Sequence, residues 1–379
     1  MSQIPGKILI CAGEASGDLH ASAVIASMLR DNPEHTFFGV AGPAMRQAGC
    51  HAIHQMDELN VMGIGDVIRA LPRIRRVEAS LCQWAEENRP ALAILVDFPG
   101  FNMRLGRKLK AMDVPVLHYI APKLWAWGAW RTKKLKLSQD RLASILPFEV
   151  KWFKEREIEV KYVGNPSAVS CKGGWSSQQL KNHLGMEESD RLLALLPGSR
   201  PGEISRHASL LSKSYLEIKE RYPCLQAVTS RAPGVTDDQL KPLTEAGVRV
   251  VDRMESEYAM RADAAVAVSG TATLELALWD VPSVLVYRSS PGMVWLARKL
   301  VQTECAGLAN ILLGDKPVMP ELIQEYATVE NIIDELEHIL DGPGSLAQRT
   351  KFAELRTILG DQNPSEGVSR LAMELISLR

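Results

Sequence analysis

Three acidic side chains in the first half of the chain stand where they could take a proton from a hydroxyl group. Glu14 and Asp97 each follow an apolar run typical of a buried parallel strand, and Asp18 lies one helical turn beyond Glu14. Ligands of α/β proteins bind at the carboxyl edge of such a sheet, where a well-placed carboxylate can serve as a general base. Simpler interpretations stay open, because Asp97 precedes the turn-forming pair Pro99-Gly100, and Ser16 and Asp18 are preferred residues at helix starts. We expect these residues to face a ligand-binding cleft.

In the second half of the chain, the segment Leu196-Pro197-Gly198-Ser199-Arg200 ends another apolar run and precedes a helical pattern. Free backbone N–H groups at the start of that helix, with the hydroxyl of Ser199 and the guanidinium of Arg200 nearby, would suit a diphosphate. The alternative is a plain strand–turn–helix connection in which Arg200 points to water.

A second loop, Ser269-Gly270-Thr271, repeats this arrangement after the apolar run 264–268. Its hydroxyl and N–H groups would lie at a helix N-terminus, and Glu275 follows one turn further along the helix. A carboxylate at that place can bind the ribose hydroxyls of a nucleotide, although it is also a favourable charge near the start of any helix. The chain contains neither a P-loop sequence nor G-x-G-x-x-G, so the pattern does not favour a nicotinamide cofactor.

Two further features could contact an apolar substrate. Trp125 and Trp127 follow a strand pattern, where they could line a pocket or fasten a loop.

The segment 60–81 has apolar residues on one helical face and arginines on the other, and we expect Pro72 to kink or interrupt this helix. The apolar face could contact membrane or acyl chains, or it could simply cover the sheet. The candidate contact residues are Val61, Met62, Ile64, Val67, Ile68 and Leu71.

Strand and helix patterns alternate along the chain, which predicts parallel sheets joined by right-handed crossovers. Strands are expected at residues 7–12, 36–41, 91–96, 116–120, 142–146, 160–163, 192–196, 225–229, 248–251, 264–268 and 283–287. Helices are expected at 19–29, 177–184, 329–340, 345–359 and 365–378. The predicted organisation is a Rossmann-like domain (1–166), a polar linker (167–190), a second Rossmann-like domain (191–345) and C-terminal helices (346–379).

The composition is that of an ordinary globular protein, with 379 residues of which 46% are hydrophobic and 23% charged. No apolar run reaches the roughly 20 residues of a membrane-spanning helix, and the N-terminus lacks a signal-peptide pattern. The six cysteines are scattered, which indicates reduced thiols in the cytosol. Cys50-His51-Ala52-Ile53-His54 resembles half of a metal site, but without a second Cys/His pair we expect a surface turn and no metal.

Charge is distributed unevenly along the chain. Residues 1–165 hold 22 Lys and Arg against 17 Asp and Glu, whereas the remaining residues hold 22 against 28. The basic first half indicates an anionic partner there, either a phosphorylated substrate or an acidic membrane surface. A nucleic acid is not expected, because the chain carries no recognised binding motif and is not basic overall.

Short motifs spread along nearly the whole chain together resemble those of the lipid-A-disaccharide synthase family. They are Gly13–Asp18, Gly39–Met45, Val61–Gly63, Asp97–Asn102, His118-Tyr119, Trp125–Trp127, Leu146–Glu149, Leu195–Arg200 and Ser269–Glu275. Each motif alone is weak, but their order is specific. The resemblance implies a GT-B fold with two Rossmann-like domains facing across a cleft. It also implies an inverting, metal-independent glycosyltransferase that needs no cofactor. Such an enzyme transfers 2,3-diacylglucosamine from its UDP conjugate to the 6-hydroxyl of 2,3-diacylglucosamine 1-phosphate (lipid X), giving a β-1,6 disaccharide 1-phosphate and UDP.

Carried over residue by residue, the resemblance implies that Asp97 is the general base and that Arg200 is the essential arginine facing the departing UDP. It places Ser199, Ser269, Gly270, Thr271, Glu275 and Asn310 at the UDP-sugar, and Glu14 and Ser16 beside the active site. The family's membrane-facing segment corresponds to residues 61–77. The chain departs from the family pattern at Ala309, at Gly128-Ala129-Trp130 and over 167–185, which affects local loop shape but not the chemistry.

The resemblance further implies a cytoplasmic enzyme held peripherally at the inner membrane, able to form homodimers that exchange C-terminal segments. Two other functions are weighed against it: a GT-B enzyme acting on a soluble UDP-GlcNAc substrate, and a non-catalytic nucleotide-sugar or lipid-binding module. The arginine-studded apolar segment and the paired tryptophans favour an acylated substrate. Asp97, Arg200 and Glu275, all present, argue against a module without activity.

Overall fold

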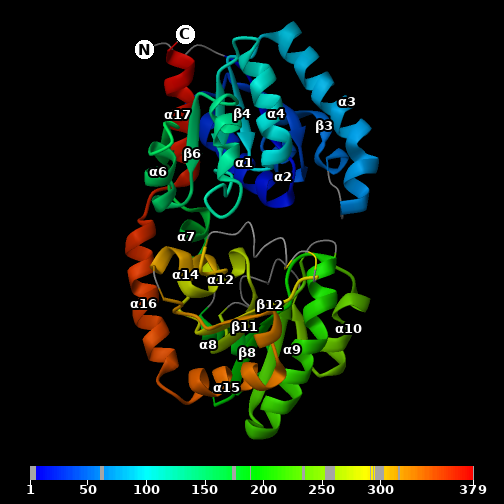
Figure 1. The fold of residues 1–379 in the computed structure, drawn as a ribbon, viewed down its shortest axis with the longest axis vertical. Coiled ribbons are helices and arrows are strands. Elements are labelled where there is room, and N and C mark those ends of the chain that lie inside the picture. Colours follow the sequence, from blue (N-terminus) through cyan, green and yellow to red (C-terminus); the bar gives the residue numbers. More distant parts are fainter. Residues whose placement is uncertain are drawn as a thin grey trace. The chain divides into compact units, whose positions relative to one another are not determined.

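The computed structural model describes residues 6–59, 64–172, 176–187, 189–232, 235–251, 261–290, 292, 294, 303–314 and 316–378. The chain divides into two compact units. Unit 1 comprises Met1–Pro166 and Asp361–Arg379, and unit 2 comprises Ser167–Gly360. Each unit holds its own sheet (Figure 1). The stretch expected as a linker, 167–190, falls within unit 2, and residues 361–379 fall within unit 1.

The sheet of unit 1 has the strand order β3-β2-β1-β4-β5-β6-β7, and all of its pairings are parallel. Its strands are β1 (Lys7–Ala12), β2 (Thr36–Ala41), β3 (Cys50–Gln55), β4 (Leu92–Val96), β5 (Val116–Tyr119), β6 (Arg141–Ser144) and β7 (Val160–Tyr162). Its helices are α1 (Ala15–Asp31), α2 (Pro43–Gln47), α3 (Ile64–Asn88), α4 (Pro99–Lys110), α5 (Thr132–Lys136), α6 (Pro147–Lys154) and α17 (Pro364–Ser377). Two 3-10 turns, η1 (Met56–Glu58) and η2 (Ala129–Arg131), complete the described part of the unit.

Alternate residues of the central strand β1 enter two different cores. Ile8 and Ile10 pack with residues of α1 and α17, whereas Leu9 and Cys11 pack with residues of α3 and α4. A strand buried on both faces must be apolar at every position, which is why the sequence alone identifies it. The C-terminal helix α17 is therefore part of the core of unit 1.

Strand β3 corrects one expectation from the sequence. The segment from Cys50 to His54, expected as a surface turn, forms an edge strand that pairs in parallel with β2. The ring of His51 stacks on Phe38 of β2, with ring centroids 5.1 Å apart. The strand was missed because half-exposed edge residues give no continuous apolar run.

The amphipathic segment folds into α3, which continues through Pro72, so the expected interruption is wrong. Proline removes only one N–H from the helix, and Pro72 is exposed, while Ile74 and Val77 are buried against the sheet and α4. From Ala70 onward this helix covers the sheet. Of the proposed membrane-contact residues, Leu71 is half-buried, whereas Val61, Met62 and the side chains of Ile64, Val67 and Ile68 lie outside the described residues.

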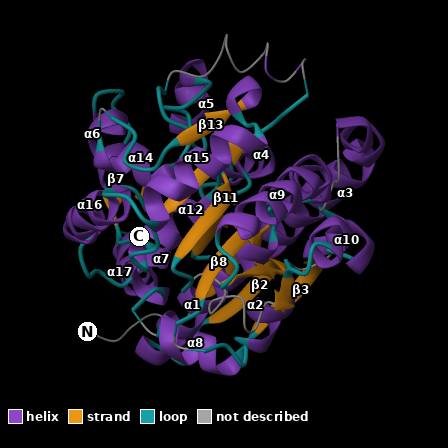
Figure 2. Ribbon diagram, turned by 90° about the horizontal axis from the view of Figure 1, so that it is seen from below, coloured by secondary structure: helices purple, strands orange, loops and turns teal. Residues whose placement is uncertain are grey.

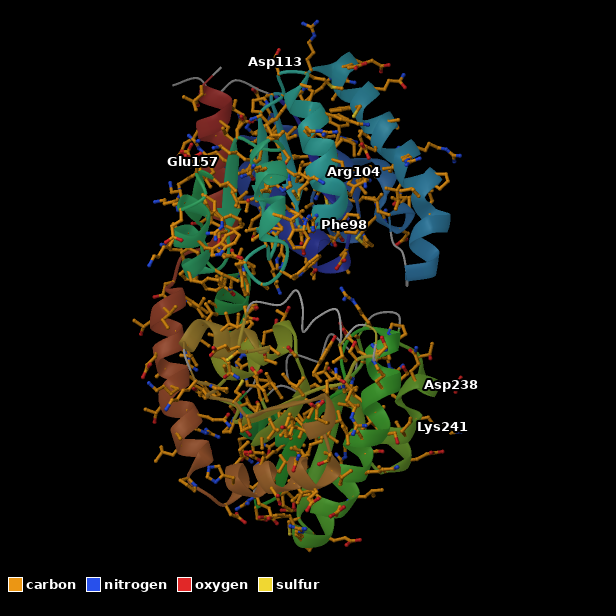
Figure 3. The ribbon with its side chains drawn as sticks, viewed as in Figure 1. Phe98, Arg104, Asp113, Glu157, Asp238 and Lys241 are labelled. Atoms are coloured by element: carbon orange, nitrogen blue, oxygen red, sulfur yellow. The ribbon has the colours of Figure 1, made fainter. Side chains whose placement is uncertain are left out.

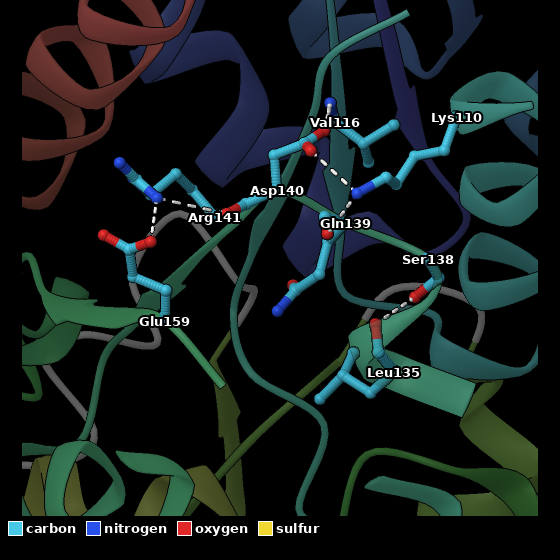
Figure 4. Close-up of polar contacts among 8 residues, drawn as sticks. All are labelled: Lys110, Val116, Leu135, Ser138, Gln139, Asp140, Arg141 and Glu159. Carbon is cyan, nitrogen blue, oxygen red and sulfur yellow. Dashed lines mark hydrogen bonds and ion pairs between the residues drawn. The ribbon is translucent and has the colours of Figure 1, made fainter. Parts of the chain in front are cut away.

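Helix α4 is fixed by ionic contacts to two neighbours. Arg104 Nε and Lys108 Nζ lie 3.1 and 2.8 Å from the carboxylate of the buried Glu78 on α3, and Figure 3 marks Arg104 on its helix. At the last residue of the helix, Lys110 Nζ donates to Asp140 Oδ1 at 2.7 Å just before β6 (Figure 4). These contacts fix the second half of α4 against α3 and the segment before β6.

The sheet of unit 2 has the order β10-β9-β8-β11-β12-β13, again with parallel pairings. Its strands are β8 (Arg191–Leu196), β9 (Leu225–Ser230), β10 (Arg249–Val251), β11 (Ala264–Val268), β12 (Ser283–Tyr287) and β13 (Glu321–Ile323). Its helices are α8 (Ser177–His183), α9 (Pro201–Arg221), α10 (Asp237–Glu245), α12 (Thr271–Leu278), α14 (Leu308–Leu313), α15 (Val329–Leu340) and α16 (Gly344–Leu359). The short helix α7 (Pro166–Ser170) crosses the boundary between the units, and η3 (Gln324–Tyr326) follows β13. Helices α9, α10 and α15 pack in one core on this sheet.

Candidate functional site

In each unit the strand order reverses at one point, between β1 and β4 in unit 1 and between β8 and β11 in unit 2. Open α/β sheets bind ligands outside the carboxyl ends of the strands at this point. Ala12 pairs with Val96, and Leu196 pairs with Ala267, so the loops that follow begin side by side. Figure 2 shows β8 beside β11. We call residues 13–18 with 97–102 the unit 1 switch point, and residues 197–203 with 269–275 the unit 2 switch point.

Asp97 sits on a strained elbow between β4 and α4. Asp97 and Phe98 both have left-handed backbones, with φ of 48° and 46°, which costs roughly 1–2 kcal/mol per non-glycine residue. The side-chain amide of Asn102 donates to the carbonyl oxygens of Val96 (3.1 Å) and Asp97 (2.7 Å), and the Asp97 N–H donates to Tyr119 (2.9 Å). These bonds hold the half-buried Asp97 at the end of its strand.

The loop after β1 packs directly against this elbow. A Cβ atom on Gly13 would lie 2.6 Å from Cγ of Phe98, so only glycine fits there (Figure 3 labels Phe98). Glu14 follows and is half-buried, and Ser16 is exposed in the first turn of α1. The structure therefore brings Glu14 and Asp97 to one edge of the sheet, as the sequence predicted for parallel strands.

Asp18 is placed differently. It is 3% exposed, and its carboxylate accepts hydrogen bonds from the backbone N–H groups of Gly42 (3.0 Å), Ala44 (2.9 Å) and Met45 (3.0 Å). These N–H groups belong to the turn that starts α2, so Asp18 caps α2 rather than its own helix. The observed contacts give this side chain a structural role at the edge of the site.

Replacing Asp18 by Ala is expected to lower the free energy of unfolding by about 3 kcal/mol or more, because three N–H groups lose their acceptor. Urea denaturation measures this as a lower midpoint with an unchanged slope. Glu34→Ala, which removes an exposed carboxylate from the loop before β2, is the control and leaves the midpoint near that of the parent protein. A midpoint for Asp18→Ala equal to that of the control would contradict the capping role.

The two tryptophans have separate environments. Trp125 is 7% exposed, and its indole N–H donates to Oε1 of Glu149 at 2.8 Å, while Trp127 is 47% exposed near Arg131. Glu149 is itself buried in the first turn of α6 and also bonds the hydroxyl of Ser144. Trp125 therefore fastens the loop after β5, and Trp127 is the one that can contact a ligand.

Burial raises the pKa of Glu149 from its ordinary 4.5 to about 7, although hydrogen bonds from Ser144 and Trp125 oppose the rise. The folded state thus holds this proton more tightly than the unfolded state, so the stabilisation is complete below about pH 4.5 and is lost as the pH rises through 7. Between these values we expect the stability of the parent protein, relative to Glu149→Gln, to fall by about 3 kcal/mol. Chemical denaturation of both proteins at each pH measures the difference. Parallel pH profiles would contradict the prediction.

The turn after β8 is already closed by its own carboxylate. Gly198 has φ of 109°, and Oε2 of Glu203 accepts the N–H groups of Ser199 (3.1 Å) and Arg200 (3.2 Å). Glu203, at the third position of α9, therefore takes the two N–H groups that lead into the helix, so a diphosphate there would have to use the N–H groups of the helix itself. The side chains of Ser199 and Arg200 are exposed at this edge, so the guanidinium is the group the turn presents.

The turn before α12 has a different geometry. Gly270 and Thr271 are exposed, and the first N–H groups of a helix have no partner within it. Glu275, one turn further, is half-buried and accepts a hydrogen bond from the hydroxyl of Ser167 at 3.4 Å. The Ser269 hydroxyl donates to the carbonyl oxygen of Ala306 at 2.7 Å.

Asn310 is fully buried, and its side-chain amide makes all four of its possible hydrogen bonds. Its Nδ2 donates to Met319 (2.8 Å) and Glu321 (2.7 Å), and its Oδ1 accepts from Val318 (3.0 Å) and Met319 (2.9 Å). Asn310 therefore holds residues 318–321 in place through its side-chain amide. The sequence did not predict the polar contacts of four residues: Glu321, Glu203, Glu149 and Asn102. Among these, only Glu203 could have been identified from the sequence, because it is the third residue of a helix, where a carboxylate can accept N–H groups of the preceding turn.

Neither metal nor membrane-spanning features occur in the described part of the chain. No group of three His, Cys, Asp or Glu side chains is arranged to hold an ion there. The helices of the described ranges include none that is both long and apolar enough to cross a membrane. The six cysteines are all free thiols.

The fold places the chain in a known structural class. UDP-GlcNAc 2-epimerase from Neisseria meningitidis, solved bound to UDP-GlcNAc, aligns with a TM-score of 0.66 at 14% identity, over 98% of this chain and 100% of its own. MurG from Acinetobacter baumannii aligns with a TM-score of 0.58 at 13% identity, over 98% and 100%. The two Rossmann-like units are therefore those of the GT-B class of glycosyltransferases and epimerases.

Sequence comparison narrows this class. The profile of a family described as "Lipid-A-disaccharide synthetase" matches residues 8–367. The lipid-A-disaccharide synthase of Geobacter metallireducens is 37% identical over 381 residues, which is 99% of each chain. The chain belongs to the lipid-A-disaccharide synthase family, and it is a glycosyltransferase by that membership.

Proposed function

We propose that this protein transfers 2,3-diacylglucosamine from UDP-2,3-diacylglucosamine to the 6-hydroxyl of lipid X, releasing UDP. Family membership supports the reaction, and the observation that carries it in the structure is Asp97, held on a strained elbow at the unit 1 switch point. Backbone strain of this kind persists where neighbouring contacts enforce it, and it often marks functional sites. In this proposal unit 1 binds the acceptor and unit 2 binds the nucleotide sugar.

The proposed mechanism is a single inverting displacement. The carboxylate of Asp97 takes the proton of the acceptor 6-hydroxyl while that oxygen attacks C1 of the donor sugar from the face opposite the diphosphate. The bond from C1 to the diphosphate oxygen breaks, and UDP leaves with the electron pair. Arg200 and the N-terminus of α12 stabilise the growing negative charge, and Glu275 binds the ribose. With these groups supplying the positive charge, we propose that no metal takes part.

The test is product analysis with purified protein, UDP-2,3-diacylglucosamine and lipid X, in the presence of a chelator. Mass spectrometry should detect the disaccharide 1-phosphate, and the proton coupling at the new anomeric carbon should show the β configuration. Absence of the disaccharide, together with turnover of UDP-GlcNAc alone, would favour the soluble-substrate alternative. Loss of activity in chelator that returns with Mg²⁺ would overturn metal independence.

We also propose peripheral binding at the cytoplasmic face of the inner membrane. The acceptor and product carry acyl chains, and the basic first half of the chain would attract anionic lipid. Sedimentation with vesicles should increase with their anionic lipid content and decrease with salt.

The proposed homodimer forms through C-terminal segments. It would place α17 of one copy against α1 of another copy, whereas in the structure α17 packs against α1 of its own chain. Light scattering of the purified protein tests that arrangement.

A further inference from the structure

One carboxylate of unit 2, outside the switch point but linked to it by hydrogen bonds, has no role in the proposed reaction so far. Glu321, at the start of β13, accepts the N–H of Ala306 on Oε2 at 2.7 Å and the N–H of Gly307 on Oε1 at 2.9 Å. Oε1 also accepts Nδ2 of Asn310 at 2.7 Å. Three donors thus converge on one side chain, and two of them are backbone groups of the loop before α14.

This loop is tied to the unit 2 switch point by Ser269. The Ser269 hydroxyl donates its only proton to the carbonyl oxygen of Ala306. The N–H of the same residue, Ala306, donates to Glu321. Gly307 packs close to β12, since a Cβ there would lie 2.3 Å from Cδ2 of Leu285. The orientation of the Ser269 hydroxyl is therefore set by a chain of contacts that ends at Glu321.

The direction of the Ser269 hydrogen bond decides what this hydroxyl can recognise. A serine hydroxyl has one proton and two lone pairs. Because the proton is directed to Ala306, the oxygen is left to accept a hydrogen bond. Phosphate oxygens at neutral pH are acceptors, whereas the hydroxyl groups of a sugar or ribose are donors.

We infer that Glu321 is a positioning residue for the nucleotide sugar, and that it fixes Ser269 as an acceptor for a ligand hydroxyl rather than as a donor to the diphosphate. The inference rests on the proposed function of this site as the place where the UDP-sugar binds. In this proposal Asn310 contributes to the site indirectly, because its amide supports Glu321 and the adjoining backbone.

The test is a double-mutant cycle with UDP as the binding probe. In Glu321→Gln one acceptor oxygen becomes an NH₂ group that faces a donor, so the loop loses its geometry. In Ser269→Ala the exposed hydroxyl is removed with no change in packing. Calorimetry should show each single variant binding UDP, or UDP-2,3-diacylglucosamine where the contacted hydroxyl is on the sugar, about 10- to 100-fold more weakly. The double variant should be no weaker than the weaker single variant, because both act through one contact.

Steady-state kinetics supply the second readout. The KM for the UDP-sugar should rise in both variants, while the KM for lipid X stays near that of the parent protein; the midpoint of thermal unfolding should stay near the parental value in Ser269→Ala. Glu220→Gln, which removes an exposed carboxylate from α9, is the charge-matched control. If Glu321→Gln unfolds early, Glu321→Asp, which keeps the charge, takes its place in the cycle.

Each outcome decides between the two proposals. Losses that multiply in the double variant, or parent-like affinity for both nucleotides in Glu321→Gln, would overturn the positioning role while leaving the reaction intact. A parent protein that binds UDP in a Glu321-dependent way but forms no disaccharide would overturn the proposed function alone. A parent protein that binds neither nucleotide would overturn both.

Discussion

Asp97→Asn is expected to lower kcat by about 10²- to 10⁴-fold, the usual contribution of a positioned general base. The substitution is well matched to the elbow. Asn and Asp are the non-glycine residues that tolerate the left-handed backbone best, so Asn can keep the φ of 48° seen at this position. The Asp97 backbone bonds to Tyr119 and Asn102 use main-chain atoms and survive the change. The basic oxygen is lost while the backbone of the elbow is kept.

Asp97→Ala provides the matched comparison. Alanine removes the carboxylate and also adds backbone strain, so it should lower both kcat and the thermal unfolding midpoint. Asp97→Asn should lower kcat alone, with the KM for the UDP-sugar unchanged. Stopped assays of disaccharide formation and thermal unfolding of both variants give the comparison. An Asn variant with near-parental turnover would remove Asp97 from the role of base.

Many strands of the two sheets were predictable because their physics is local. Buried parallel strands are continuous apolar runs, and β1, β2, β11 and β12 have the bounds expected from the sequence. The carboxyl edge shared by parallel strands then brought Glu14 and Asp97 together without any knowledge of tertiary contacts. By contrast, β3 and β13 were not predicted: the half-exposed β3 gives no continuous apolar run, and β13 has only one fully buried residue and begins with a charged one.

The roles of buried polar residues could not be predicted, because they depend on partners far away in the sequence. Asp18 suited a helix start or a ligand, but it caps α2 through N–H groups more than 20 residues away. Asn310 matched a ligand-binding position, yet its amide is used entirely inside the loop. In both cases the residue type fits the chemistry, and only the three-dimensional partners show which groups use it.

The role expected of Arg200 depends in the same way on a partner, Glu203, which binds its backbone N–H. Because Glu203 occupies the N–H groups of Ser199 and Arg200, these two backbone donors are not offered to a diphosphate. The positive charge at this loop must then come from the guanidinium, whose side chain is exposed at the edge of the sheet. A planar guanidinium presents a fixed pair of parallel N–H groups to two oxygens of a diphosphate, whereas a lysine ammonium acts as a point charge.

Arg200→Ala is therefore expected to lower kcat by about 10²- to 10³-fold, the usual effect of removing one donor to a developing oxyanion. The turn should keep its shape, because Gly198 and Glu203 form it with backbone atoms and a separate carboxylate. Arg200→Lys keeps the charge without the bidentate geometry, so it should recover only part of kcat. Arg221→Ala, at the far end of the same helix, is the matched control and should keep parental turnover. If Arg200→Ala instead raised the KM for the UDP-sugar with kcat unchanged, the arginine would bind the donor equally in the ground and transition states, and the charge on the leaving UDP would have to be stabilised by the N-terminus of α12.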